Sequence, residues 1–163
     1  MVIIVMGAAG AGKTTIGRAL ATELGWQFVD ADDLHPAHSV EKMRAGVPLD
    51  DRDRAPWIAR IHAAIARALD RREHAVVACS ALKERYRQAL RSDLRPVRFV
   101  YLKASADVLK QRLGSRHGHL AGPALVTSQL ADLEEPHDEA SLTLDATLPA
   151  ETILGAIREQ FGV

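Results

Sequence analysis

The sequence predicts an α/β fold in which five parallel strands form one sheet and helices cover both of its faces. Short apolar runs alternate with amphipathic helical segments along the chain, which is the pattern of strand–helix–strand units. The first run, residues 2–6, is apolar at every position, as a central parallel strand requires. A glycine-rich loop follows it directly, at residues 7–14. In such sheets ligands bind at the carboxyl ends of the strands.

The predicted elements follow from apolar periodicity and from glycine and proline positions. Strands are expected at residues 2–6, 27–29, 75–79, 97–102 and 142–146. Helices are expected at residues 12–24, 40–44, 56–72, 83–91, 105–113 and 124–133, and from residue 149 onward.

Individual residues justify these helices in chain order. The first carries Ile16, Leu20 and Leu24 at spacing four and stops at Gly25. The short second helix is closed by Gly46. Ser105 would cap the helix at 105–113, and Pro149 would lie in the first turn of the last helix. The long third helix has a core stripe made of Trp57, Ile58, Ile61, Ile65 and Leu69.

Composition narrows the class of protein. The 163 residues predict one domain, residues 1–163, with 47% hydrophobic and 26% charged residues. Because 21 basic residues balance 21 acidic ones, charge gives no reason to expect a nucleic-acid or membrane partner. The single Cys79 excludes an intramolecular disulfide. A cytoplasmic setting is therefore expected.

The loop at residues 7–14 matches G-x-x-x-x-G-K-[ST] between a predicted strand and a predicted helix. Its main-chain N–H groups at a helix N-terminus would bind phosphate. Lys13 would reach the β- and γ-phosphates, and the Thr14 hydroxyl would bind Mg²⁺. The alternative is a Gly/Ala-rich turn that matches by chance. The residues expected to bind ATP here are Gly7, Gly10, Ala11, Gly12, Lys13, Thr14 and Thr15.

Two carboxylates follow the second predicted strand. At a spacing of two residues, Asp30 and Asp32 can point the same way. Phosphoryl transfer needs one acid near Mg²⁺ and another that positions or deprotonates the acceptor hydroxyl. The alternative is a solvated loop whose aspartates cap a helix.

Two further basic segments have both a functional and a structural interpretation. Arg112 and Arg116 are four residues apart beside several glycines, which suits a mobile lid at about residues 113–123 that closes on ATP. An exposed helix end with basic residues is the alternative. Lys83 and Arg87 share one predicted helix face after the third strand, either to bind an anionic substrate or as a solvated basic face.

Six segments, in order and covering most of the chain, resemble one family. They are VMGAAGAGKTT at 5–15, DADDLHP at 30–36, EKMRAGVPLDDRDRAPW at 41–57, CSALKERYRQALR at 79–91, RLGSRHGH at 112–119 and LVTSQLADLEEP at 125–136. The family is that of the small bacterial-type gluconokinases, which are P-loop NTPases with a nucleoside-monophosphate-kinase-like fold and a mobile lid. The phosphate loop is shared by many kinases, whereas the LHP, PLDDRDRAPW and CSALK segments are more specific.

The resemblance implies transfer of phosphate from ATP to D-gluconate with Mg²⁺, often by a homodimer. It also implies roles for individual residues. Asp30 would bind Mg²⁺ through water, Asp32 would act as the base, and Arg112 and Arg116 would clamp ATP. The acceptor pocket would consist of Asp32, His35, Arg54, Lys83 and Arg87.

Other functions stay open at this point. Another small-metabolite kinase, such as a shikimate kinase, would share the phosphate loop. A nucleoside monophosphate kinase is a weaker alternative, because the LHP segment counts against it. A nucleotide-binding module without transferase activity belongs to a different class, and no sugar acid would accelerate its ATP hydrolysis.

Overall fold

The computed structural model of the chain describes residues 1–92, 94, 96–114 and 123–163. Its five strands form one sheet in the order β2-β3-β1-β4-β5, and every neighbouring pair is parallel. The strands are β1 (Val2–Met6), β2 (Gln27–Asp30), β3 (Ala75–Ala78), β4 (Val97–Lys103) and β5 (Ser141–Asp145). The predicted fold class and number of strands are therefore confirmed.

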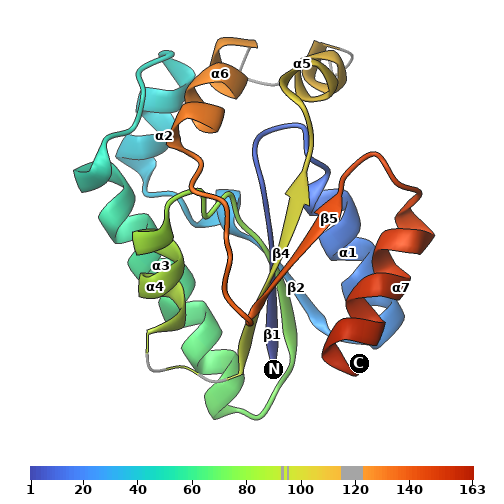
Figure 1. Cartoon of the computed structure of the whole chain (residues 1–163). Coiled ribbons are helices and arrows are strands. Elements are labelled where there is room, and N and C mark those ends of the chain that lie inside the picture. The colour runs from blue at the N-terminus through green and yellow to red at the C-terminus, as the bar shows by residue number, and fades with distance from the viewer. Residues whose placement is uncertain (93, 95, 115–122) are drawn as a thin grey trace.

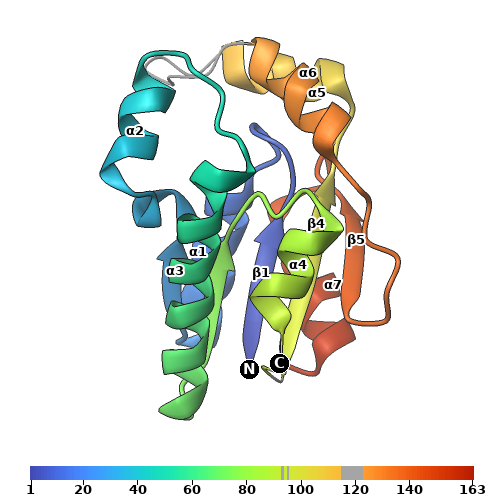
Figure 2. The same ribbon diagram turned by 90° about the vertical axis from the view of Figure 1, so that its left-hand side faces the viewer.

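Helices cover both faces of this sheet (Figure 1). One face carries α1 (Lys13–Leu24) and α7 (Ala150–Phe161), and the other carries α3 (Asp51–Asp70) and α4 (Glu84–Arg91). The remaining elements are η1 (Ala31–Leu34), α2 (Ala37–Arg44), α5 (Ala106–Gly114) and α6 (Pro123–Asp132). Figure 2 shows α2, α5 and α6 gathered at the end of the sheet where the strands finish.

The central strand β1 divides the core into two layers. Val2, Ile4 and Met6 point to the α3 side, and Ile3 and Val5 point to the α1 side, as strand alternation requires. All five are completely buried, so the phosphate loop directly follows a strand that has no exposed residue. The predicted stripe on α3 is also confirmed, with Leu69 partly buried at its end.

Helix α3 begins five residues earlier than predicted, at Asp51 instead of Pro56. The reason is a capping box: Asp50 accepts from the Asp53 N–H, and the Asp53 carboxylate accepts from the Asp50 N–H. Lys42 on α2 also donates to Asp53 at 2.8 Å, and this hydrogen bond lowers the pKa of the Asp53 carboxyl. The charged run is therefore the first turn of a helix, and it fixes the position of Arg54.

Among the described residues, no helix combines the length and apolar character needed to cross a bilayer.

Candidate active site

The phosphate loop requires glycine at two positions for reasons of space. Gly7 and Gly10 have positive φ values of 144° and 87°. A Cβ on Gly7 would lie 2.8 Å from the carbonyl oxygen of Leu102, and one on Gly10 would lie 2.9 Å from that of Leu109. Both distances are shorter than van der Waals contact allows. The loop is therefore packed directly against β4 and α5, which hold its main-chain N–H groups in a fixed arrangement.

The side chain of Lys13 lies over the same loop. Its Nζ donates to the carbonyl oxygen of Ala8 at 3.1 Å. Gly12 forms the N-cap of α1 in a left-handed conformation, so the helix begins at Lys13 itself. The loop thus combines an ammonium group with the positive end of a helix dipole, as a site for polyphosphate requires.

Thr14 and Asp30 come together from two different elements. The Thr14 hydroxyl, at the start of α1, donates to Asp30 Oδ2 at 3.0 Å. The other oxygen of Asp30, at the end of β2, accepts from the N–H of Asp32 at 3.1 Å and so caps η1. A hydroxyl and a carboxylate beside a phosphate loop are hard oxygen ligands, which fit Mg²⁺.

Cys79 directly follows β3, and charged residues of the candidate site act on its thiol. Burial raises the pKa of its thiol to about 12, and the charges of Asp32, Lys13 and Asp30 also act on it. Lys13 follows the loop after β1, and Asp30 and Asp32 lie at and just after the end of β2, so all three belong to the carboxyl edge of the sheet. Cys79 itself is 1% exposed and is a buried core residue, as predicted.

His35 follows η1 and is held by a flat contact with Trp57. The two rings are stacked with centroids 4.5 Å apart and planes 7° from parallel, and Trp57 Nε1 donates to the Ala31 carbonyl at 2.7 Å. Burial lowers the pKa of His35; the nearby Asp32 opposes this effect and Arg54 adds to it. His35 Nδ1 is buried without a hydrogen-bond partner in the described part of the chain.

Two of the predicted acceptor cations meet at one carboxylate that the sequence did not reveal. Asp132, the last residue of α6, lies 3.5 Å from Arg54 NH1 and 3.2 Å from Lys83 Nζ. Arg54 also donates to the hydroxyl of Tyr86 at 3.4 Å. Asp132 lies in the family segment 125–136, but no role was assigned to it from the sequence, because that role depends on the packing of α6 over the acceptor side.

Arg87 has a different environment from Arg54 and Lys83. It is 1% exposed, and its guanidinium donates to the carbonyls of Ala81 and Leu82 and to the Glu84 carboxylate. The prediction that Lys83 and Arg87 share a helix face is wrong, because α4 begins at Glu84 and Lys83 is its extended N-cap. In this conformation Arg87 supports the segment that carries Lys83.

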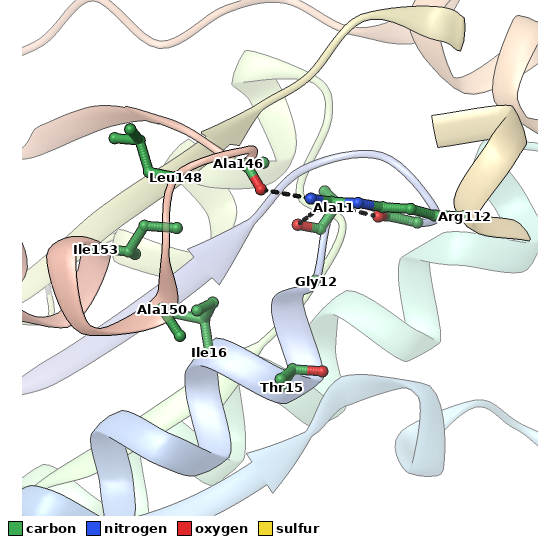
Figure 3. Close-up of a pocket in the computed structure, with 10 residues that line it drawn as sticks. Ala11, Gly12, Thr15, Ile16, Arg112, Ala146, Leu148, Ala150 and Ile153 are labelled. Carbon is green, nitrogen blue, oxygen red and sulfur yellow. Dashed lines mark hydrogen bonds between the residues drawn. The ribbon is translucent and has the colours of Figure 1, made fainter. Parts of the chain in front are cut away.

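A hollow of about 350 Å³ lies beside the phosphate loop (Figure 3). Arg112 borders it, donating to the Ala146 carbonyl at 2.8 Å and to the carbonyls of Gly10 and Ala11 at 3.5 Å. Arg116 and residues 115–122 of the predicted lid lie outside the described residues. The other residues that line the hollow are Gly12, Thr15, Ile16, Leu148, Ala150 and Ile153. Those from β5 onward carry no motif, so the sequence did not predict them.

The comparisons with known proteins agree with this geometry. A family model described as an AAA domain matches residues 2–138. A gluconokinase from Gluconobacter oxydans is 47% identical over 137 residues, which cover 84% of this chain and 77% of the relative.

Two solved structures are also similar. A sugar kinase from Janibacter sp. has a TM-score of 0.93 and 36% identity, covering 99% of this chain and 94% of the other. A gluconokinase from Sinorhizobium meliloti has a TM-score of 0.82 and 40% identity, covering 98% and 89%. With its phosphate loop and sheet in the arrangement described above, this chain belongs to the gluconokinase family.

Proposed function

We propose that the chain transfers the γ-phosphoryl group of ATP to the 6-hydroxyl of D-gluconate, giving 6-phospho-D-gluconate and ADP and so feeding gluconate into carbohydrate catabolism. The observation that carries the proposal is the pairing of two half-sites at one edge of the sheet. The phosphate loop with Lys13 forms one half. Asp32, His35 and Arg54 form the other half, and the charges of Asp32 and Arg54 both act on the His35 ring.

The nucleotide half follows from the loop and the adjoining hollow. The base and ribose would enter the hollow beside Arg112, and the phosphates would lie on the N–H groups of residues 10–15. Lys13 would then contact the transferring phosphate, where charge develops in the transition state. From the sequence, Arg116 is proposed as a second cation on the same phosphates.

Thr14 and Asp30 would hold Mg²⁺, since both present oxygen atoms beside the phosphate loop. The ion would supply neutralising charge for the phosphate oxygens. The residues of the chain itself provide the rest of the site by binding and orienting the substrates.

On the acceptor side, Asp32 would take the proton from the gluconate 6-hydroxyl. That oxygen would form a bond to the γ-phosphorus as the bond from phosphorus to the bridging oxygen of ADP breaks. Because burial lowers the pKa of His35, this ring is neutral near pH 7. Its Nδ1 would donate a hydrogen bond to a gluconate hydroxyl or accept one from it, depending on the tautomer. Arg54 and Lys83 would face the carboxylate, since a planar guanidinium suits two hydrogen bonds to it.

A substrate panel tests this function. ADP release is measured with ATP, Mg²⁺ and one acceptor at a time: gluconate, shikimate, glucose or AMP. Gluconate alone should strongly accelerate the release, and Lys13→Met should abolish that acceleration while remaining folded. Acceleration by shikimate or AMP in place of gluconate would overturn the proposal. No acceleration by any acceptor would favour a nucleotide-binding module without transferase activity.

The proposal also includes a single kinase domain over residues 1–163 and a cytoplasmic location, which length and composition favour, and a homodimer, as the family resemblance implies. Light scattering of the purified chain measures the mass directly and separates a dimer from a monomer of 17.7 kDa.

A further inference from the structure

Asp132 is paired with the two cations to which the proposed function assigns the acceptor carboxylate. Its two oxygens are shared between the two cations, with Oδ2 3.5 Å from Arg54 NH1 and Oδ1 3.2 Å from Lys83 Nζ. The side chains of Arg54, Lys83 and Asp132 are 24%, 22% and 31% exposed, so a solute can reach all three. One internal carboxylate thus bridges two cations from α3 and from the segment before α4.

We propose that Asp132 is an internal stand-in for the acceptor carboxylate and that gluconate displaces it from Arg54 and Lys83; this inference rests on the proposed function. Two carboxylates at one pair of cations repel each other, and they would have to share the donors that now bind Asp132. Gluconate binding therefore includes breaking two ion pairs. A neutral sugar has no charged group with which to replace them.

The position of Asp132 connects this exchange to the phosphate loop. Asp132 ends α6, and Gln129, three residues earlier on the same helix, accepts a hydrogen bond from Ala9 N–H. Residues three apart on a helix lie on one face. Displacement of Asp132 would release the acceptor end of α6 while Gln129 keeps the helix attached to the nucleotide side. Asp132 thereby sets the affinity of the acceptor site and not that of the ATP site.

The test replaces Asp132 by the isosteric amide. Asp132→Asn keeps the volume but removes the competing charge, so gluconate should bind more tightly. Because the ion pairs are partly exposed, the dissociation constant for gluconate should fall by about threefold to tenfold. Calorimetric titration of each protein with gluconate, without ATP, measures this directly. The KM for gluconate should fall in parallel, and the KM for ATP should stay unchanged.

Two further variants control for fold and for general charge. Glu135→Gln removes a carboxylate three residues along that pairs with Lys103 instead, so its gluconate affinity should equal that of the wild type. Asp132→Glu restores the charge and should return the affinity towards the wild-type value. In one outcome, the wild-type protein phosphorylates gluconate while Asp132→Asn binds gluconate equally or less tightly than wild type. That result would overturn this inference alone. A wild-type protein without gluconate-dependent ADP release would overturn the proposed function and this inference with it.

Discussion

Gln129 on α6 accepts a hydrogen bond from the main-chain N–H of Ala9, with nitrogen and oxygen 2.6 Å apart. The two residues are 120 positions apart in the chain, and this contact ties the helix after the predicted lid to the phosphate loop. The loop is thereby supported by β4, by α5 and by one side chain of α6.

Removing that side chain should weaken ATP binding. In Gln129→Ala, the Ala9 N–H loses its partner, and a lost hydrogen bond of about 0.5–1.5 kcal/mol corresponds to roughly a twofold to tenfold change in affinity. We expect the KM for ATP to rise by that factor, with little change for gluconate. Ser128→Ala, at the exposed neighbouring position, is the matched control. Equal ATP affinity in both variants would mean that β4 and α5 alone hold the loop.

Asp32→Asn should lower turnover far more than it affects ATP binding. The amide keeps the size of the side chain but cannot accept the acceptor proton, and general base catalysis contributes about 10²–10⁴-fold. Steady-state kinetics at saturating gluconate measures kcat directly. Asp33→Asn, at the exposed adjacent carboxylate, is the control and should retain activity.

Asp30→Asn should give a different result, because Asp30 contacts Thr14 at the proposed Mg²⁺ site. Its turnover should recover in part at higher Mg²⁺, whereas that of Asp32→Asn should not. Wild-type kcat for Asp32→Asn would show that another group takes the proton.

Replacing Arg54 should affect gluconate binding, whereas replacing Arg87 should affect the stability of the fold. Arg54→Met should raise the KM for gluconate about ten- to a hundredfold, since a charged hydrogen bond is lost. Arg87→Met should instead lower the free energy of unfolding by about 2–3 kcal/mol, because the buried carbonyls of Ala81 and Leu82 lose their donor. Urea unfolding and gluconate kinetics on both variants check this. An Arg87→Met protein of normal stability with a raised KM would place Arg87 in the acceptor pocket.

His35 should make the stability of the fold depend on pH. Burial lowers its pKa below the ordinary value of 6.5, so on acidification the unfolded chain takes up a proton before the folded one does. The stability contributed by neutral His35 is therefore present above pH 6.5 and is lost as the pH falls through the folded pKa. The stability advantage of wild type over His35→Gln should shrink between pH 7.5 and pH 5.5 in urea unfolding. A constant advantage would contradict the pKa direction.

The fold could be predicted because its signals are local. Strand 2–6 with its glycine loop, the alternation of elements and the α3 stripe each depend on residues close in sequence, and the sheet agrees with them. Thr14 and Asp30 were both selected for Mg²⁺ from the sequence, and the structure places them in contact. The start of α3 was instead predicted five residues too late, although Asp50 and Asp53 have the spacing of a capping box.

The contacts made by α6 could not be predicted in this way. Gln129 and Asp132 lie in the family segment 125–136, but no role was assigned to either, and their partners Ala9, Arg54 and Lys83 lie between 49 and 120 positions away. Only the packing of α6 over the carboxyl end of the sheet gives them a role. Arg87 was expected either to bind an anionic acceptor or to lie on a solvated basic face, but its burial and its main-chain acceptors give it a structural task in this conformation.

The strand order has a consequence for how the chain folds during synthesis. The strand that carries the phosphate loop is made first, yet both of its neighbours, β3 and β4, are made more than 70 residues later. Such long-range pairing forms slowly, and an unpaired apolar strand is exposed to aggregation meanwhile. Gly7 also needs the Leu102 carbonyl beside it before the loop reaches its final shape. A chain that ends before β4 therefore lacks the finished phosphate loop, so ATP could stabilise the protein only after residue 102 has been made.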